Sequence, residues 1–260
     1  MGATKIEFRL RVAIMAVIIT LGFWAPWIEP LGIGKRVSLM AWLAFGLTRL
    51  GLFQFGVAVP VVIVLSALIA ATAVVLRIWG TAWLGANTVL HGQMKAGVVM
   101  ADGPYRYVRN PLYLGSWCMF AAMAFVMPPT GALFSMILLT AFLLRLILGE
   151  EAFLSHQLGQ PYQDYLRAVP RLFPRLRVKL WPDGIRPTGR KPQWLRAMTS
   201  EVNPIGVFIT MAFLSWSYDG RLMVRAIIVS LGISLVVHAL MPNAPRLGDT
   251  ADEHVAANPL

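Results

Sequence analysis

Residues 109–151 read RNPLYLGSWCMFAAMAFVMPPTGALFSMILLTAFLLRLILGEE, and this stretch decides the fold. Two long apolar runs flank a short connection, Pro128–Thr130. A connection of this length joins two helices that lie side by side and run in opposite directions. The stretch therefore predicts a helical hairpin whose open end brings Arg109 close to the adjacent acids Glu150 and Glu151.

The composition places this hairpin in a membrane protein. Of the 260 residues, 57% are hydrophobic and 13% are charged, and the mean hydropathy is +0.65. Soluble domains carry about 25% charged residues, and a helix needs about 20 apolar residues to cross a bilayer. The sequence predicts an all-α polytopic bundle with six transmembrane spans, at 10–28, 57–79, 111–127, 131–149, 203–217 and 222–241. The segment 37–54 is ambiguous, and seven spans result if it also crosses.

The distribution of basic residues indicates which side of the membrane each polar segment faces. Residues 167–196 contain nine Lys and Arg against one acid, and the N-terminus is also basic. Cytoplasmic segments of membrane proteins are enriched in Lys and Arg. Both basic segments reach the cytoplasm if 37–54 does not cross, which favours six spans. The polar segments that flank the hairpin, 80–110 and 150–200, then lie together on the cytoplasmic face.

Charge and cysteine content narrow the classes of function. The net charge is +11, which the positive cytoplasmic loops explain without a nucleic-acid partner. The single cysteine, Cys118, cannot form an intramolecular disulfide. No metal site is predicted, because the four histidines fall at no spacing typical of metal ligands.

Polar residues gather at the expected open end of the hairpin. Glu150 and Glu151 follow an apolar run directly, where the helix dipole is negative, so the two carboxylates need a partner or a function. Arg109 is the candidate partner, and the alternative is a purely structural ion pair that fixes two helix ends. Asn110 and Pro111 suit the N-cap and the first position of the helix that follows them.

Two segments resemble one superfamily of membrane enzymes. They read GVVMADGPYRYVRNPLYLG at 97–115 and GEEAFLSHQLGQPYQDYLRAVPRLFP at 149–174. With the apolar hairpin between them, they resemble the isoprenylcysteine carboxyl methyltransferase and phospholipid methyltransferase superfamily of integral membrane methyltransferases. Its pattern is G-x-Y-x-x-x-R-H-P-x-Y-x-G, a hydrophobic stretch, E-E, F-G-x-x-Y-x-x-Y and a basic segment that ends in proline. The resemblance covers about 80–174, a little over a third of the chain.

The chain departs from this pattern at two places. Asn110 stands where the superfamily often has a histidine. A second histidine, frequent shortly before the G-x-Y segment, is absent, and Gly97 lies near its place. Asparagine at the first position is common in relatives of the phospholipid-methylating type, so the departures bear on the acceptor and not on the methyl donor.

The resemblance implies an S-adenosylmethionine pocket at the cytosolic end of the helices. The implied catalytic residues are Arg109, Glu150 and Glu151. Arg109 would bind a carboxylate of the donor or the acceptor, and the acids would hold the ribose or amino group of the donor or orient Arg109. The residues implied to bind the cofactor are Gly103, Tyr105, Asn110, Pro111, Tyr113, Gly115, Tyr162 and Tyr165.

The acceptor implied by the resemblance is lipophilic. The leading interpretation is an isoprenylcysteine carboxyl methyltransferase-like enzyme, and the alternatives are N-methylation of a phospholipid ethanolamine and S-methylation of a small thiol. The alternative of another class is a non-enzymatic multi-span protein or transporter that retains the fold. A transporter would need polar residues at mid-membrane depth, and charged residues are sparse inside the predicted spans.

These interpretations predict a single methyltransferase domain over 1–242 with a motif core at 80–174. An extra C-terminal helical hairpin, 203–241, lies beyond the resemblance, and the polar tail 243–260 is expected to be disordered. The protein is expected to be integral to a cytoplasmic or inner membrane, with its active site facing the cytosol. Its expected partners are the bilayer and a lipid or other lipophilic small-molecule acceptor, and the oligomeric state is left open.

Overall fold

A computed structural model describes residues 2–85, 99–175 and 191–240, and every regular element within these ranges is helical. The tail predicted at 243–260 and the central part of the basic loop, 176–190, lie outside the described residues. The elements are α1 (Lys5–Arg9), α2 (Arg11–Trp24), α3 (Ile28–Leu31), α4 (Leu39–Arg49), α5 (Phe55–Leu84), the 3-10 helix η1 (Gly103–Arg106), α7 (Pro111–Ala124), α8 (Pro129–Leu158), α9 (Gln160–Ala168), α10 (Trp194–Ser200), α11 (Val202–Ala212), the 3-10 helix η2 (Leu214–Ser217) and α12 (Gly220–Leu240).

Three of these helices are long and apolar enough to cross a membrane. They are α5 and α8, with 30 residues each, and α12, with 21 residues. A fourth crossing results if α10 and the α11–η2 segment form one span, although the two parts are bent by 69°. The helices α2, α4 and α7 are apolar but have fewer than 18 residues. The described residues therefore form an all-helical integral membrane bundle with three or four candidate spans, and the count of six for the chain remains a prediction.

The long helices extend beyond the spans predicted from hydropathy. The predicted span 131–149 is part of α8, which continues to Leu158. Glu150 and Glu151 therefore lie two turns inside a helix, and the expectation that they occupy a helix C-terminus is wrong. Hydropathy marks where a helix leaves the apolar layer, whereas this helix ends where Gly159 adopts a φ of 61° and Pro161 follows.

The ambiguous segment 37–54 contains the short helix α4. With 11 residues it is about 16 Å long, too short to cross the hydrocarbon core by itself. The Ser38 side chain caps its N-terminus by accepting a hydrogen bond from the Ala41 N–H. The N–H groups of Leu39 and Met40 donate to carbonyls in the turn between α7 and α8. These bonds attach α4 to the closed end of the hairpin.

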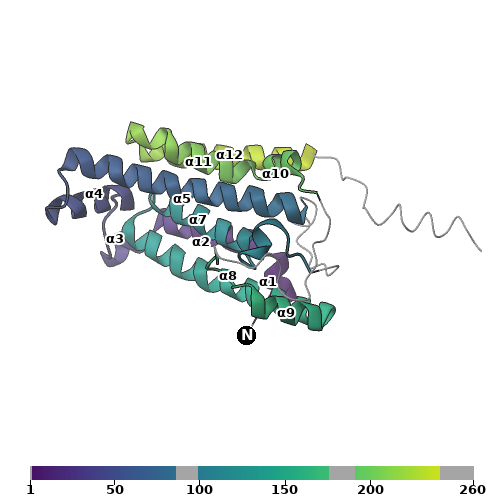
Figure 1. The fold of residues 1–260 in the computed structure, drawn as a ribbon. Coiled ribbons are helices and arrows are strands. Elements are labelled where there is room, and N and C mark those ends of the chain that lie inside the picture. Colours follow the sequence, from purple (N-terminus) through teal and green to yellow (C-terminus); the bar gives the residue numbers. More distant parts are fainter. Residues whose placement is uncertain (1, 86–98, 176–190, 241–260) are drawn as a thin grey trace, which may run out of the picture.

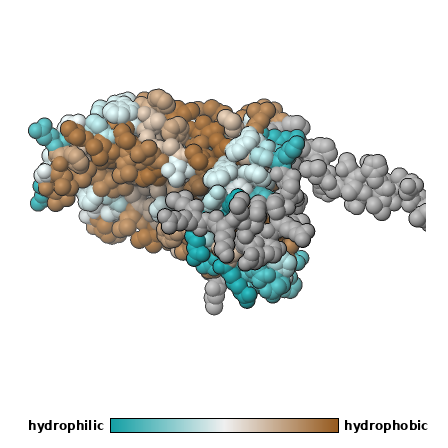
Figure 2. Space-filling view, viewed as in Figure 1, coloured by the Kyte–Doolittle hydropathy of each residue, from teal (hydrophilic) through white to brown (hydrophobic). Residues whose placement is uncertain are grey.

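The predicted hairpin is formed by α7 and α8. The two helices contact each other, α5 lies along α7, and α2 lies along α8 (Figure 1). Beyond the hairpin, α11 and α12 pack against each other, and α11 also packs on α5. In Figure 2 apolar residues cover much of the bundle, while polar residues gather at the end that carries α9.

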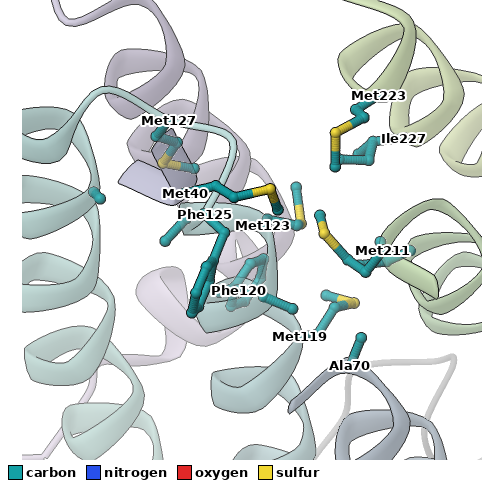
Figure 3. Packing of buried hydrophobic residues seen from close by; sticks show 14 of the residues in the cluster. Met40, Ala70, Met119, Phe120, Met123, Phe125, Met127, Met211, Met223 and Ile227 are labelled. Atoms are coloured by element: carbon teal, nitrogen blue, oxygen red, sulfur yellow. The ribbon is translucent and has the colours of Figure 1, made fainter. Parts of the chain in front are cut away.

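Methionine side chains fill the centre between α4, α7, α11 and α12. Met40, Met119, Met123, Met211 and Met223 are all buried in one cluster (Figure 3). The flexible thioether side chain adapts to irregular gaps between helices that cross at different angles. This centre holds the C-terminal helices against the hairpin, so α11 and α12 share one core with the helices that resemble the methyltransferase superfamily.

The contact between α2 and α8 depends on two glycines. A Cβ atom at Gly131 would overlap the carbonyl oxygen of Gly22, and the Ser135 hydroxyl donates a hydrogen bond of 3.1 Å to the Ile18 carbonyl. Small residues allow helix backbones to approach this closely in membranes. Helix α2 therefore packs against α8 through direct backbone contact.

We expect Gly131→Ala to destabilise the fold by about 1–3 kcal/mol, because the new methyl group must push α2 away from α8. Thermal unfolding of the purified protein in detergent measures the effect. Gly232→Ala is the matched control, since Gly232 lies in α12 and nothing lies within 4 Å of the added Cβ. An equal response of the two variants would contradict the proposed backbone contact.

Candidate active site

The open end of the hairpin joins the residues that the sequence places at its two ends. Arg109 directly precedes the N-cap of α7, and its Nη1 atom lies 3.2 Å from the Glu151 Oε1 atom on α8. The Glu151 side chain is buried and that of Arg109 is nearly so, with exposed fractions of 8% and 11%. The predicted proximity of Arg109 to the acidic pair is therefore confirmed, and Glu151 is the acid that it contacts.

A second arginine, Arg171, also binds Glu151 and was not predicted as a site residue. Its Nη2 and Nε atoms lie 2.8 Å and 3.1 Å from the Glu151 Oε2 atom. These hydrogen bonds raise the pKa of the Arg171 guanidinium above its ordinary value. Arg171 lies in the basic segment of the superfamily pattern, and that segment is the signal in the sequence that points to it.

Asn110 occupies the predicted N-cap of α7 without capping it through its side chain. Its Nδ2 atom lies 3.3 Å from the Glu151 Oε1 atom and 3.2 Å from the Arg171 carbonyl oxygen. The expected capping hydrogen bond is absent at this described residue. Pro111 takes the first helical position, as predicted. Glu151 therefore receives two guanidinium groups and one amide, which satisfies a carboxylate buried in an apolar setting.

Backbone hydrogen bonds hold the two arginine segments together. The Arg109 N–H donates to the Pro170 carbonyl over 2.9 Å, and the Arg175 N–H donates to the Tyr107 carbonyl over 3.1 Å. The chain that follows α9 therefore runs beside the chain that precedes α7. This pairing presents Arg109 and Arg171 to Glu151 from adjacent segments.

Three buried tyrosines connect α9, η1 and α5. The Tyr165 hydroxyl donates a hydrogen bond of 2.6 Å to the Tyr105 carbonyl, and the Tyr105 hydroxyl donates one of 3.4 Å to the Gly80 carbonyl. The rings of Tyr162 and Tyr165 lie 5.8 Å apart. Burial raises the pKa of Tyr105, Tyr162 and Tyr165 above the ordinary tyrosine value.

These shifts predict alkaline unfolding. Because the folded-state pKa values of Tyr105, Tyr162 and Tyr165 lie above the unfolded value of about 10, their contribution to stability is complete below that pH and is lost above it. We expect the intact protein to ionise fewer than its six tyrosines before helical structure is lost. Ultraviolet titration of tyrosinate, followed together with circular dichroism, measures this. Ionisation of all six with the helices intact would contradict it.

The two adjacent acids have different surroundings. Glu150 interacts with the Tyr113 phenol, which is within hydrogen-bonding reach, and with the positive charge of Arg11. Tyr113 in turn packs beside Phe8 and its buried neighbours. Glu150 therefore faces the N-terminal helices, whereas Glu151 faces the arginines.

The two predicted site glycines accommodate side chains of α5. Gly103 has a φ of +56°, and a Cβ atom there would overlap the Trp83 indole. A Cβ atom at Gly115 would lie 2.6 Å from the Arg77 Cγ atom. The close approach that was expected at these glycines is made by Trp83 and Arg77, and a ligand role for either glycine remains a prediction.

The arrangement retains capacity to bind an anionic group. The Arg109 Nε atom is buried and has no hydrogen-bond partner among the described residues, and the same holds for the Trp83 Nε1 atom. A buried donor without a partner costs free energy that an acceptor group of a ligand would recover. The Arg109 Nε atom is therefore a buried donor at this site that an acceptor group of a ligand could satisfy.

Two hollows of the described chain lie away from this site. Two overlapping apolar hollows are lined by Phe55, Val59 and Tyr218, among other residues, and neither includes a predicted site residue. Along α5, Phe55 is about 38 Å from Gly80, whose carbonyl accepts the Tyr105 hydrogen bond. The cofactor pocket predicted at the Arg109 end is therefore not confirmed by a cavity.

Comparison with protein-family models agrees with the predicted resemblance. Residues 61–161 match the model described as phospholipid methyltransferase. The match runs from α5 to the start of α9 and includes Arg109, Glu150 and Glu151, but it ends before Arg171. The comparisons with curated proteins and with solved structures found no match. The resemblance to the isoprenylcysteine and phospholipid methyltransferase superfamily is thereby confirmed.

Proposed function

We propose that the protein is an S-adenosylmethionine-dependent methyltransferase that methylates a lipophilic acceptor at the cytosolic surface of the membrane. The observation that carries the proposal is the cluster of Arg109, Asn110 and Arg171 around Glu151 at the open end of the hairpin. The match of 61–161 to the phospholipid methyltransferase model supports the same reaction class.

The cluster suits a methyl donor that combines a carboxylate, an amino group and a ribose. When bound, S-adenosylmethionine supplies a methyl group activated by its positively charged sulfur. Arg109 would bind the carboxylate with its free Nε donor and its planar fork, which fits a carboxylate better than a lysine ammonium does. Glu150 would accept hydrogen bonds from the amino group or the ribose, because Glu151 is already occupied by its three partners.

The surrounding residues would orient the reactants and exclude water. Tyr105, Tyr162 and Tyr165 are buried, so their rings lower the local dielectric and strengthen the charge interactions of Arg109 and Glu150. Holding two reactants in line converts a bimolecular step into one that is effectively unimolecular, which is a large part of catalysis for group transfer. The proposed contribution of this chain is therefore orientation and desolvation.

The charge of the site favours an anionic acceptor, as in isoprenylcysteine carboxyl methylation. Arg106, Arg109, Arg171 and Arg175 lie in the two paired segments, against Glu150 and Glu151 on α8. A carboxylate is already nucleophilic and needs no base. This agrees with the surroundings of the site, because the nearest histidine on α8, at position 156, is exposed to solvent.

A phospholipid ethanolamine is the second candidate acceptor. The family-model match and the asparagine at position 110 both favour it. An amine must first lose a proton, and Glu150, held beside Tyr113, is the described carboxylate best placed to accept it. The two candidates therefore differ in whether Glu150 acts as a base.

Calorimetric titration of S-adenosylmethionine into the detergent-purified protein tests the proposal. Saturable binding to one site supports it, and absence of binding to a folded sample would favour a non-enzymatic membrane protein. Transfer of a labelled methyl group is then measured with a prenylcysteine analogue, phosphatidylethanolamine and an alkyl thiol in separate reactions. The ester, amine or thioether that accumulates identifies the acceptor class.

A further inference from the structure

A second buried ion pair joins α5 to the C-terminal helices. The Arg77 Nε atom lies 2.5 Å from the Glu201 Oε2 atom, and the Arg77 Nη2 atom lies 3.1 Å from Oε1. The Glu201 side chain is 1% exposed and that of Arg77 is 18% exposed. Glu201 lies outside the segment that matches the phospholipid methyltransferase model. Neither residue binds Glu151, and the stem of the Arg77 side chain meets the site at Gly115.

Two hydroxyl groups complete this pair. Thr81 donates to the Glu201 Oε1 atom over 2.6 Å, and the Arg77 Nη1 atom donates to the Ser116 hydroxyl over 2.6 Å. One cluster thus connects α5, α7 and the junction between α10 and α11. Both oxygens of the Glu201 carboxylate and three nitrogens of the Arg77 guanidinium have hydrogen-bond partners within the cluster. We therefore do not propose the cluster itself as a ligand site.

The position of Glu201 explains why an acid is used there. It lies at the 69° bend between α10 and α11, and it is the N-cap residue of α11. Glu201 is also the C-cap residue of α10, so the helix dipoles on the two sides of the bend oppose each other at its carboxylate. The full positive charge of Arg77 and the Thr81 hydroxyl compensate the buried acid at this bend within an apolar bundle.

The same turn of α5 supports the candidate active site. Arg77 and Thr81 bind Glu201, while the Gly80 carbonyl between them accepts the Tyr105 hydrogen bond. Tyr105 is also the residue whose carbonyl accepts the Tyr165 hydroxyl. A shift of this turn of α5 would therefore move the support of η1, which leads directly to Arg109.

We propose that Arg77 and Glu201 form a positioning pair that fixes this turn of α5 beneath Tyr105. Through the pair, α10–α12 help to hold η1 and the proposed S-adenosylmethionine site in position, although these helices lie beyond the segment that matches the family model. This inference rests on the proposed function, because the quantity that the pair controls is the affinity for S-adenosylmethionine. The alternative is that the pair contributes only to the stability of the fold.

The test separates geometry from stability. Breaking a buried pair with Glu201→Gln is expected to lower the unfolding temperature by about 10 °C and to weaken donor binding about tenfold. The double variant Arg77→Met with Glu201→Leu replaces the pair by apolar groups and is expected to regain most of the unfolding temperature. Its donor affinity is expected to stay about tenfold below that of the unmodified protein, since the directional bonds to Thr81 and Ser116 are gone.

A matched control is the exposed pair of Glu29 and Arg36, which lie 3.0 Å apart. Glu29→Gln is expected to change neither the unfolding temperature nor donor binding. Donor affinity of the double variant equal to that of the unmodified protein would overturn the inference and leave a stability role.

Hydrogen exchange of 102–109 provides a readout that does not depend on the donor. It is expected to accelerate in the double variant relative to the unmodified protein, and unchanged exchange would also overturn the inference. If the unmodified protein binds no donor, the proposed function fails, and the exchange comparison alone decides whether the pair positions η1.

Discussion

Arg109→Ala is expected to reduce methyl transfer by about 100-fold or more and to weaken S-adenosylmethionine binding by a similar factor. Arg109 lies against Glu151, and its Nε atom is a buried donor that has no partner among the described residues. Its removal takes away the proposed anchor for the donor carboxylate and also one partner of Glu151. Calorimetric titration of the donor and transfer of a labelled methyl group measure the two effects.

Arg109→Lys separates the role of charge from that of geometry. A lysine ammonium keeps the positive charge but cannot form the planar, two-pronged contact of a guanidinium. We therefore expect it to restore the unfolding temperature more fully than it restores donor affinity. Arg36→Ala, which removes an arginine from an exposed pair, is the control and is expected to leave transfer unchanged. Wild-type donor affinity in Arg109→Ala would show that the anchor lies elsewhere.

The hairpin could be predicted because its signals are local. Two apolar runs and a three-residue connection determine that the helices are neighbours, and the pairing of Arg109 with the acids follows from that geometry. The choice between Glu150 and Glu151 could not be predicted in the same way. Adjacent residues on a helix point about 100° apart, so the outcome depends on how α8 is rotated within the bundle.

Contacts between distant segments could not be predicted from a single sequence. Arg171 is one of nine basic residues in 167–196, and nothing local distinguishes the one that reaches Glu151. Arg77 and Glu201 are 124 positions apart and lie in different predicted spans or connections. Their pairing depends on the bend between α10 and α11, and a hydropathy profile does not report a bend.

The role of the Asn110 side chain could not be predicted from local rules either. An asparagine before a proline is a good N-cap by local rules, but the Asn110 amide donates hydrogen bonds to Glu151 and to the Arg171 carbonyl instead. Leaving a buried carboxylate without hydrogen-bond donors costs more free energy than leaving the first turn of a helix uncapped, because a turn that begins with proline already lacks one N–H group. The tertiary contact therefore outweighs the local preference.

Glu151→Leu is expected to cause the largest loss of stability among single substitutions at the site, about 3–5 kcal/mol. Glu151 is the common acceptor for Arg109, Asn110 and Arg171. Arg171 is 42% exposed and can turn toward water, but Arg109 is 11% exposed and would stay buried with its charge uncompensated. The unfolding temperature in detergent is expected to fall by about 10 °C or more.

Two further variants identify the cause of this loss. The double variant Arg109→Met with Glu151→Leu removes both charges and is expected to recover much of the unfolding temperature, while donor binding remains lost. Glu7→Gln, which removes an acid paired with Arg145 in a partly exposed setting, is the control and is expected to have little effect. An unfolding temperature of Glu151→Leu equal to that of the unmodified protein would contradict the uncompensated-charge explanation.

The comparison of Glu151→Gln with Glu150→Gln then assigns different roles to the two adjacent acids. Glu151 is enclosed by three donors from segments on both sides of the hairpin, so Glu151→Gln is expected to lower stability and, through Arg109, donor affinity. Glu150 interacts with Tyr113 and stays outside that network, so Glu150→Gln is expected to weaken donor binding with little change in the unfolding temperature. Equal stability losses in both variants would mean that the acids form one structural unit, and the proposed donor contact of Glu150 would have to be abandoned.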